Sequence, residues 1–189
     1  MNILTISLPL IILIGVLILI GGWLISLYNM LITGRNRVKE GWSDIEVQLK
    51  RRYDLIPNII NAVKGYAQHE DRVFTQVTTA RASAMQAQTP TSHAAAEAQL
   101  SQSLLSLMAV AEAYPALKAN ENFQHLQSEL VDTEDKIQAS RRFYNSLVRK
   151  FNTRVEVFPT NLVANLLGFK QYDFYDGPDE IHTPPTVSF

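Results

Sequence analysis

The chain has 189 residues, of which 47% are apolar and 19% are charged, and its formal net charge is −1. This near-neutral charge gives no electrostatic reason to expect a nucleic-acid partner. The absence of cysteine excludes a disulfide scaffold, thiol catalysis and cysteine-based metal sites. Residues 1–34 hold no charged side chain, and the first charge in the chain is Arg35. We therefore expect one membrane segment followed by one domain.

The first predicted element is a membrane-spanning helix from Leu8 to Leu27. An apolar helix of this length, at about 1.5 Å per residue, covers the roughly 30 Å of hydrocarbon in a bilayer. A cleaved signal peptide would instead have a positive amino-terminal region, a shorter apolar core and a small-residue cleavage site. Trp23 and Tyr28 lie near the end of the stretch, where amphipathic rings favour the headgroup layer. The lipid bilayer is therefore a predicted partner.

Basic residues predict the orientation of this helix. Arg35, Arg37 and Lys39 follow the apolar stretch, and no Lys or Arg precedes it. Because Lys and Arg are retained on the cytoplasmic side, we expect the amino terminus outside and the carboxyl-terminal domain in the cytoplasm.

The domain is predicted to be helical because glycine is absent from residues 66–167, which a sheet with tight turns could hardly sustain. Pro90, Pro115 and Pro159 lie near polar turn residues and mark the expected element boundaries. Between the first and second of these boundaries lies a predicted helix through Leu100 and Leu107, preceded by an arm rich in alanine, glutamine and threonine.

The first helix of the domain has an apolar seam with spacings of three and four. Its members are Val38, Trp42, Ile45, Leu49, Arg52, Ile56, Ile59 and Val63. An unpaired charge at the position of Arg52 would cost several kcal/mol, so we expect a partner for it inside the bundle or across a subunit boundary. The spacing continues past Pro57, which predicts a kink near residues 53–56 rather than a reversal.

The last long helix has a heptad seam, which is typical of coiled-coil packing at a shallow crossing angle. Its members are Phe123, Leu126, Leu130, Thr133, Ile137, Ser140, Tyr144, Leu147 and Phe151. Together these patterns predict an all-α protein in which one transmembrane helix precedes an antiparallel bundle of long helices. The predicted divisions are a membrane anchor at 1–34, the bundle at 35–157 and a carboxyl-terminal segment at 158–189.

The carboxyl-terminal segment combines a short helix at residues 161–167 with aromatic residues and an acidic, proline-bearing tail. Phe158, Phe169 and Tyr172 are among these aromatics. They could plug the open end of the bundle, or dock on a neighbouring copy or on the membrane interface. The sequence favours neither alternative.

Four motifs, in this order, resemble the LemA family of bacterial membrane proteins. They are Gly41–Asn58 (GWSDIEVQLKRRYDLIPN), Val63–Glu70 (VKGYAQHE), Tyr114–Ala119 (YPALKA) with Phe123, and Arg141 with Tyr144 and Asn145. The resemblance covers residues 24–170 and implies a single-pass protein of the bacterial inner membrane with a helical-bundle domain. It implies no established enzymatic activity. A relative that acts in magnetosome membrane formation suggests membrane organisation by analogy.

No catalytic constellation is recognisable in the sequence. His69, His93, His125 and His182 lie in different predicted elements, which favours ordinary surface histidines over a metal cluster. A glycine-rich phosphate loop is absent, and the serines lie in helical stretches. The basic run Lys50–Arg52 is expected to form ion pairs rather than to bind lipid headgroups. We therefore predict a protein that is not an enzyme and that has no cofactor or metal.

Three hypotheses about function are open, and the third of them is an enzyme whose site is built from scattered His, Asp and Glu residues. The favoured hypothesis is a non-catalytic, membrane-anchored and homo-oligomeric scaffold that organises or remodels the membrane, with Trp42, Arg52, Pro57, Tyr144, Phe158, Phe169 and Tyr172 in packing or interface positions. The alternative is an accessory or adaptor subunit of a membrane protease or signalling complex, in which the alanine-rich arm binds another membrane protein. None of these hypotheses has a nucleic-acid partner.

Overall fold

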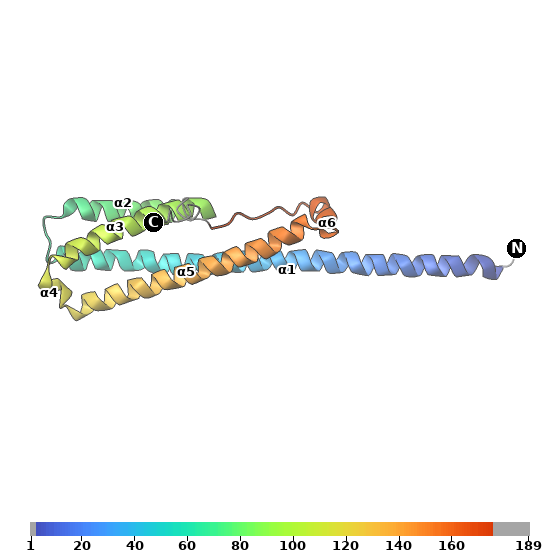
Figure 1. Ribbon diagram of the computed structural model, residues 1–189, viewed down its shortest axis with the longest axis horizontal. Helices are drawn as coiled ribbons and strands as arrows, with labels where there is room; N and C mark the ends of the chain where they lie inside the picture. Colours follow the sequence, from blue (N-terminus) through green and yellow to red (C-terminus); the bar gives the residue numbers. More distant parts are fainter. Residues whose placement is uncertain (1–2, 176–189) are drawn as a thin grey trace, which may run out of the picture. The chain divides into compact units, whose positions relative to one another are not determined.

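The computed structural model describes residues 3–175, with side chains from Pro9 onward (Figure 1). These residues form helices and no strand, so the predicted all-α fold is confirmed. The helices are α1 (Ile3–Lys64), α2 (Asp71–Gln86), α3 (Pro90–Glu112), α4 (Pro115–Lys118), α5 (Glu121–Glu156) and α6 (Thr160–Leu166). Most of the predicted acidic tail, residues 176–189, lies outside the described residues.

Helix α1 combines the predicted membrane segment and the first helix of the domain in one element of 62 residues. It continues through Pro57, which has no N–H group to bond the carbonyl of Tyr53 one turn earlier. That carbonyl accepts a hydrogen bond from Nε of Arg81 on α2, at 2.8 Å. A side chain of the neighbouring helix therefore replaces the backbone bond that the proline removes.

We predict that Arg81 and Pro57 are energetically coupled. Replacing Arg81 with methionine should lower the free energy of unfolding by about 1.5–3 kcal/mol, because the Tyr53 carbonyl loses a charged donor. In a Pro57→Ala background the new N–H group can bond this carbonyl. Replacing Arg81 with methionine in that background should therefore lower the free energy of unfolding by clearly less. Chemical unfolding of the full chain and its three variants in mild detergent measures both costs. Equal costs in the two backgrounds would contradict the coupling.

The turn between α2 and α3 is closed by hydrogen bonds that the sequence encodes locally. The Thr89 hydroxyl accepts from the Ser92 N–H at 3.1 Å, and the Ser92 hydroxyl accepts from the Thr89 N–H at 2.9 Å. Pro90 is the first residue of α3. A backbone N–H at this position has no partner within the helix, so the proline removes no hydrogen bond. Pro115 begins α4 in the same way, a one-turn helix that was not predicted from the sequence.

Helix α5 turns its predicted heptad seam inward. The buried members are Phe123, Thr133, Ile137, Tyr144 and Phe151, and the half-buried members are Leu126, Leu130, Ser140 and Leu147. Helix α6 begins after Pro159 and is followed by Gly168, whose φ of 71° lies in the left-handed region that glycine adopts without strain.

The chain divides into two compact units by packing. We call residues 1–40 and 146–172 the anchor unit, and residues 41–145 and 173–189 the core unit. The predicted boundaries at residues 34 and 157 follow changes in composition, whereas these units follow contacts. Helices α1 and α5 contribute to both units, so each unit joins segments that lie far apart in the sequence.

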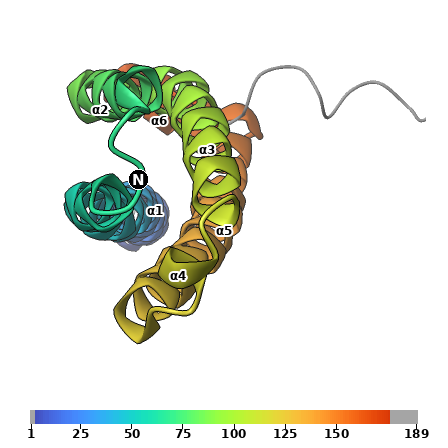
Figure 2. The ribbon, with the colours of Figure 1, turned by 90° about the vertical axis from the view of Figure 1, so that its left-hand side faces the viewer.

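In the core unit, α1, α2, α3 and α5 run in alternating directions, with α2, α3 and α5 arranged around α1 (Figures 1 and 2). Helices α2 and α3 pack side by side. Polar contacts join α1 to the other helices: Arg81 reaches it from α2, Glu97 from α3 and Asp132 from α5. The core unit is therefore an up-and-down arrangement of four helices.

Candidate functional site

The amino-terminal part of α1 is long and apolar enough to cross a membrane, and it is the one such helix among the described residues. Its apolar side chains are exposed, for example Ile18 at 68% and Leu19 at 74%. Trp23 and Tyr28 are also exposed, and Leu27 is half-buried. Leu8 belongs to α1, but its side chain lies outside the described part. An apolar surface of this kind is stable in lipid rather than in water.

An aromatic cluster in the anchor unit packs α1, α5 and the segment after α6 together. The ring of Phe169 lies 6.5 Å from that of Tyr28 and 6.4 Å from that of Phe151, between ring centroids. The ring of Tyr172 meets Phe151 edge to face at 5.5 Å. A Cβ atom added at Gly34 would lie 3.0 Å from the Phe151 ring, so α1 and α5 approach closely at this glycine.

Asn152 fixes the backbone of the segment after α6 in this unit. Its amide donates to the carbonyl of Tyr172 at 2.9 Å and accepts from the Tyr172 N–H at 2.9 Å. Phe169 and Tyr172 therefore pack inside the anchor unit, whereas Phe158 is 79% exposed. Of the predicted aromatic set, Phe158 alone projects from the described surface of this unit.

A buried polar cluster joins α1, α3 and α5 in the core unit. Arg52 is 4% exposed and pairs with the carboxylates of Glu97 at 2.9 Å and Glu134 at 2.8 Å. It also donates to the Ser101 hydroxyl at 2.8 Å. Tyr53 donates to the other oxygen of Glu97 at 2.5 Å. Arg52 is thus paired within its own chain, and a partner across a subunit boundary is not needed.

Burial raises the pKa of two members of this cluster, Glu97 and Tyr53. Removal from water raises the pKa of Glu97 above its usual range, and the Arg52 charge and the Tyr53 hydrogen bond oppose that rise. Burial and the neighbouring Glu97 carboxylate raise the pKa of Tyr53, so its hydroxyl keeps its proton and remains a donor. The other two cations of the basic run are more exposed: Lys50 pairs with Asp54 at 2.6 Å, and Arg51 pairs with Asp132 at 3.1 Å.

A cavity of about 290 Å³ lies against this cluster. Arg52, Glu97, Glu134, Arg141 and Tyr175 are among the residues that line it. The Arg141 guanidinium lies 4.6 Å from the centre of the Tyr175 ring. The Tyr175 hydroxyl is buried with no hydrogen-bond partner among the described residues. Opposite charges line this cavity in similar numbers, so it favours no ligand of one charge.

Trp42 is half-buried at the centre of an aromatic group in the core unit. Its ring lies 5.5 Å from that of Tyr144, 6.2 Å from that of Tyr175 and 5.4 Å from that of His93. Its indole N–H donates to Glu46 at 2.8 Å. Three aromatic side chains therefore pack against the indole ring.

Two neighbouring residues of α5 hold residues 173–175 in the core unit. The Tyr144 hydroxyl donates to the carbonyl of Asp173 at 2.9 Å. The Asn145 amide accepts from the Tyr175 N–H at 2.8 Å and donates to its carbonyl at 3.1 Å. Residues 173–175, the described start of the predicted acidic and extended tail, are therefore bonded to the bundle.

The histidines of the described residues belong to no metal-ligand group. No group of three or more His, Asp or Glu residues that could hold a metal occurs in the described part of the chain. His69 and His125 are exposed, and His182 lies outside the described residues. His93 differs from the predicted surface histidine, because it is half-buried against Trp42 and burial lowers its pKa.

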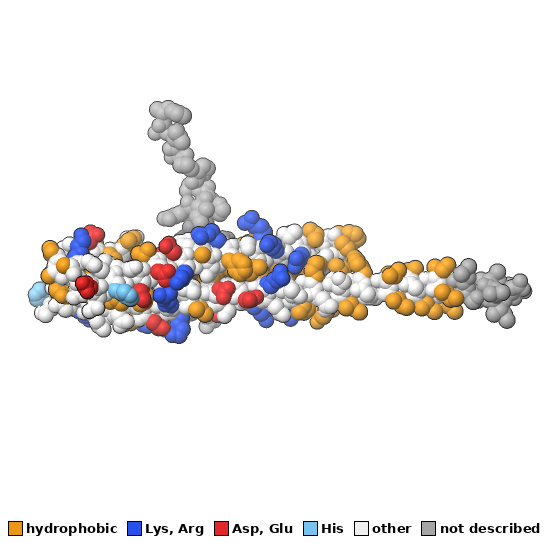
Figure 3. Space-filling model, turned by 90° about the horizontal axis from the view of Figure 1, so that it is seen from below, with side chains coloured by type: hydrophobic (Ala, Val, Ile, Leu, Met, Phe, Trp, Pro, Cys, Tyr) orange, Lys and Arg blue, Asp and Glu red, His pale blue; other side chains and the backbone are white. Residues whose placement is uncertain are grey.

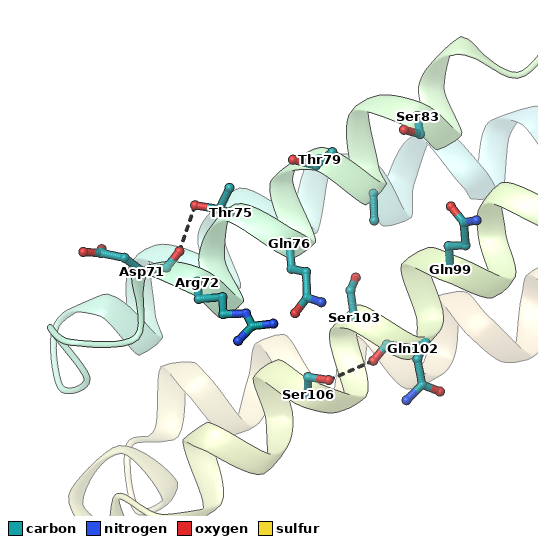
Figure 4. A pocket seen from close by; sticks show the side chains of 11 residues that line it. Asp71, Arg72, Thr75, Gln76, Thr79, Ser83, Gln99, Gln102, Ser103 and Ser106 are labelled. Atoms are coloured by element: carbon teal, nitrogen blue, oxygen red, sulfur yellow. Dashed lines mark hydrogen bonds between the residues drawn. The ribbon is translucent and has the colours of Figure 1, made fainter.

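A groove of about 710 Å³ lies between α2 and α3 in the core unit (Figure 4). Hydroxyl and amide side chains from both helices line it, including Gln76, Thr79 and Ser103. Figure 4 shows Gln76 and Ser103 pointing into the groove. Thr75 and Ser106 bond carbonyls one turn earlier on their own helices. Asp71 and Arg72 line one end of the groove, and its other lining side chains are uncharged.

Sequence inspection alone missed Glu97 as the partner of Arg52. The signal was present, because Glu97 lies three residues from both Ala94 and Leu100 on the buried face of α3. A carboxylate at such a position requires a cation, just as Arg52 requires an anion.

Comparison with known proteins gives a family and several relatives. The sequence model of the LemA family matches residues 41–189. The chain is 24% identical over 187 residues to magnetosome protein MamQ 1 of Paramagnetospirillum magneticum and to magnetosome protein MamQ of Magnetospirillum gryphiswaldense, covering 85% of this chain and 69% of each relative. It is 28% identical over 140 residues to protein LemA of Metamycoplasma hominis, covering 74% of this chain and 64% of the relative.

Proposed function

The chain belongs to the LemA family, and we propose that it is a non-catalytic, membrane-anchored scaffold that associates with copies of itself beside the bilayer. The observation that carries this proposal is the composition of α1. One helix supplies both the exposed apolar stretch and the buried seam of the core unit, including Ile45, Leu49 and Ile56. A bundle whose first helix is also its anchor stays at the membrane surface.

Confinement to a membrane favours self-association. Anchoring restricts the orientation of each copy and raises its effective concentration, so modest contacts between bundles are sufficient. Apolar side chains on three helices of the core unit are available for such contacts: Val47 on α1, Leu105 on α3 and Val131 on α5 are each at least 60% exposed. Similarity to relatives named as magnetosome proteins supports an extension of the proposal to the organisation or remodelling of a membrane.

Cysteine crosslinking in native membranes tests self-association. Because the chain has no cysteine, Val47→Cys, Leu105→Cys and Val131→Cys each introduce a single thiol at an exposed position. We expect at least one of them to give a covalent dimer under mild oxidation at native expression levels. Ala84→Cys, at a fully buried position, is the matched control and should give none. Monomer at all three exposed positions would argue against a scaffold built from copies.

The proposal includes an orientation, with the core unit in the cytoplasm of a bacterium and the amino terminus outside the inner membrane. Ser43→Cys, at an exposed position of α1, should therefore resist an impermeant thiol reagent in intact cells. Asn2→Cys should react with the same reagent, and lysed cells provide the control for thiol reactivity. Labelling at position 43 without labelling at position 2 would reverse the orientation.

The groove between α2 and α3 favours a second candidate function, an adaptor for another membrane protein. One wall of the groove is α2, which corresponds to the predicted arm rich in alanine, glutamine and threonine. The groove offers neutral hydrogen-bonding side chains to a partner segment. Thr79→Arg and Ser103→Arg would fill the groove with charge. If another chain co-purifies stoichiometrically with the wild type and is lost from these variants, the adaptor function gains support over the scaffold.

A further inference from the structure

Helix α6 exposes large apolar side chains in the anchor unit. Phe158 is 79% exposed, Leu162 is 61% exposed and Leu166 is 86% exposed. Isolated exposed leucines are common in soluble proteins, but Leu162 and Leu166 are one turn apart on the same face of α6, and Phe158 lies just before this helix. We call Phe158, Leu162 and Leu166 the α6 patch.

Contacts with α1 place the end of α6 at the edge of the apolar stretch. Phe169, just after α6, touches the ring of Tyr28, and the Arg35 guanidinium lies 5.6 Å from the centre of the same Phe169 ring. Tyr28 and Arg35 are two turns apart, or about 10 Å along the helix. Phe169 therefore lies between the last aromatic residue of the apolar stretch and the first cation, which is the depth of lipid headgroups.

A second cavity of about 290 Å³ lies at this depth. Arg35 and Lys170 line it together with the rings of Phe151, Phe169 and Tyr172. Nε of Arg35 is buried and has no hydrogen-bond partner among the described residues. Two cations beside aromatic rings suit a group that is anionic at one end and apolar at the other.

The anchor unit has a net positive charge, like the residues that line this cavity. Within its residues, seven Lys and Arg stand against two Glu. The seven are Arg35, Arg37, Lys39, Arg149, Lys150, Arg154 and Lys170, and none of them forms an ion pair with a described residue. Figure 3 shows Lys and Arg side chains gathered beside an apolar part of the surface. A second copy of this unit would meet it with like charge.

We infer that the anchor unit binds the headgroup of an anionic phospholipid between Arg35 and Lys170, with the α6 patch in the acyl-chain boundary of the same bilayer. Phosphate oxygens would accept hydrogen bonds from the two cations, and the three apolar side chains would leave water. The unit then has a second membrane contact besides the span of α1. This inference rests on the proposed membrane anchoring and is independent of self-association.

A fluorescent probe on α6 tests the inference in the full chain. Leu166→Cys, labelled with an environment-sensitive dye, is reconstituted at one copy per nanodisc in phosphatidylcholine with increasing phosphatidylglycerol. We expect the emission to shift to the blue as the anionic fraction rises, because the patch enters lipid. Val131→Cys on α5 of the core unit, 61% exposed, carries the same dye and should not shift.

Charge variants separate the headgroup site from general attraction to an anionic surface. Each cation near such a surface contributes about fivefold to apparent affinity, so Arg35→Gln with Lys170→Gln should weaken the phosphatidylglycerol response about thirtyfold. Lys50→Gln with Lys118→Gln removes the same charge from the core unit and should leave the response within about twofold. Titration with inorganic phosphate in neutral nanodiscs should give no shift.

The outcomes distinguish the inference from the anchoring on which it rests. Failure to enter nanodiscs of any composition would overturn both. Incorporation with equal emission in neutral and anionic discs would overturn the headgroup site alone. An equal loss in the two charge variants would replace the site with a diffuse electrostatic effect, and a response to inorganic phosphate would assign the cavity to a soluble anion instead of a lipid.

Discussion

Replacing Arg52 with alanine is expected to lower the free energy of unfolding by about 3–5 kcal/mol. The change removes a buried cation and leaves the Glu97 carboxylate, which is 8% exposed, with the Tyr53 hydroxyl as its remaining close donor. A buried carboxylate that loses its cation is far from the water that would otherwise solvate it. Chemical unfolding of the full chain in mild detergent measures the loss.

Two further variants show whether burial causes this effect. Arg51 is the neighbouring cation, but its side chain is 40% exposed, so Arg51→Ala should cost only about 0–1 kcal/mol. Arg52→Met with Glu97→Leu removes the two buried charges together and should recover part of the loss, since a well-packed apolar pair can replace a buried ion pair. The Tyr53 hydroxyl and the partly exposed Glu134 carboxylate lose their partners, which keeps the recovery incomplete. Equal losses for Arg51→Ala and Arg52→Ala would contradict the buried cluster.

Replacing Trp42 with alanine should also destabilise the core unit, by about 3–5 kcal/mol. The indole ring contacts Tyr144, Tyr175 and His93, so its removal leaves three aromatic side chains with lost contacts. Trp42→Phe keeps most of the ring contacts and loses the exposed hydrogen bond to Glu46, so its cost should be much smaller. The thermal unfolding midpoint of each variant measures the difference. An unchanged midpoint for Trp42→Ala would mean that the ring carries no packing energy.

Periodicity made the helices and their inward faces predictable. The seam of α1 from Val38 to Val63 and the heptad seam of α5 are local patterns, because burial of one face requires apolar residues at spacings of three and four. The proline positions were informative for the same local reason, since Pro90 and Pro115 begin helices.

The partners of individual side chains were not predictable, because they depend on how distant helices align. Arg52 was expected to need an anion, but the choice of Glu97 follows from the packing of α3 against α1. Asn145 bonds the backbone of Tyr175 in the core unit, and Asn152 bonds that of Tyr172 in the anchor unit. Asparagine is common on helix surfaces, so neither residue signals this role in the sequence.

The carboxyl-terminal aromatics separated into two groups for a similar reason. Phe169 and Tyr172 pack against Phe151, whereas Phe158 is exposed on the anchor unit. One short segment therefore contains both packed and exposed aromatic rings. Which of these rings pack against Phe151 depends on the close approach of α1 to α5 at Gly34. This approach joins segments that are far apart in the sequence.

The composition and mass of the particle extracted from native membrane test the scaffold most directly. The full chain, expressed at its native level, is extracted directly into polymer nanodiscs and its mass is determined together with the identity of every chain present. We predict a particle that contains several copies of this chain and no other protein in stoichiometric amount. A single copy per particle across several mild extraction conditions would contradict the scaffold, and one copy with one copy of another chain would establish an adaptor in its place.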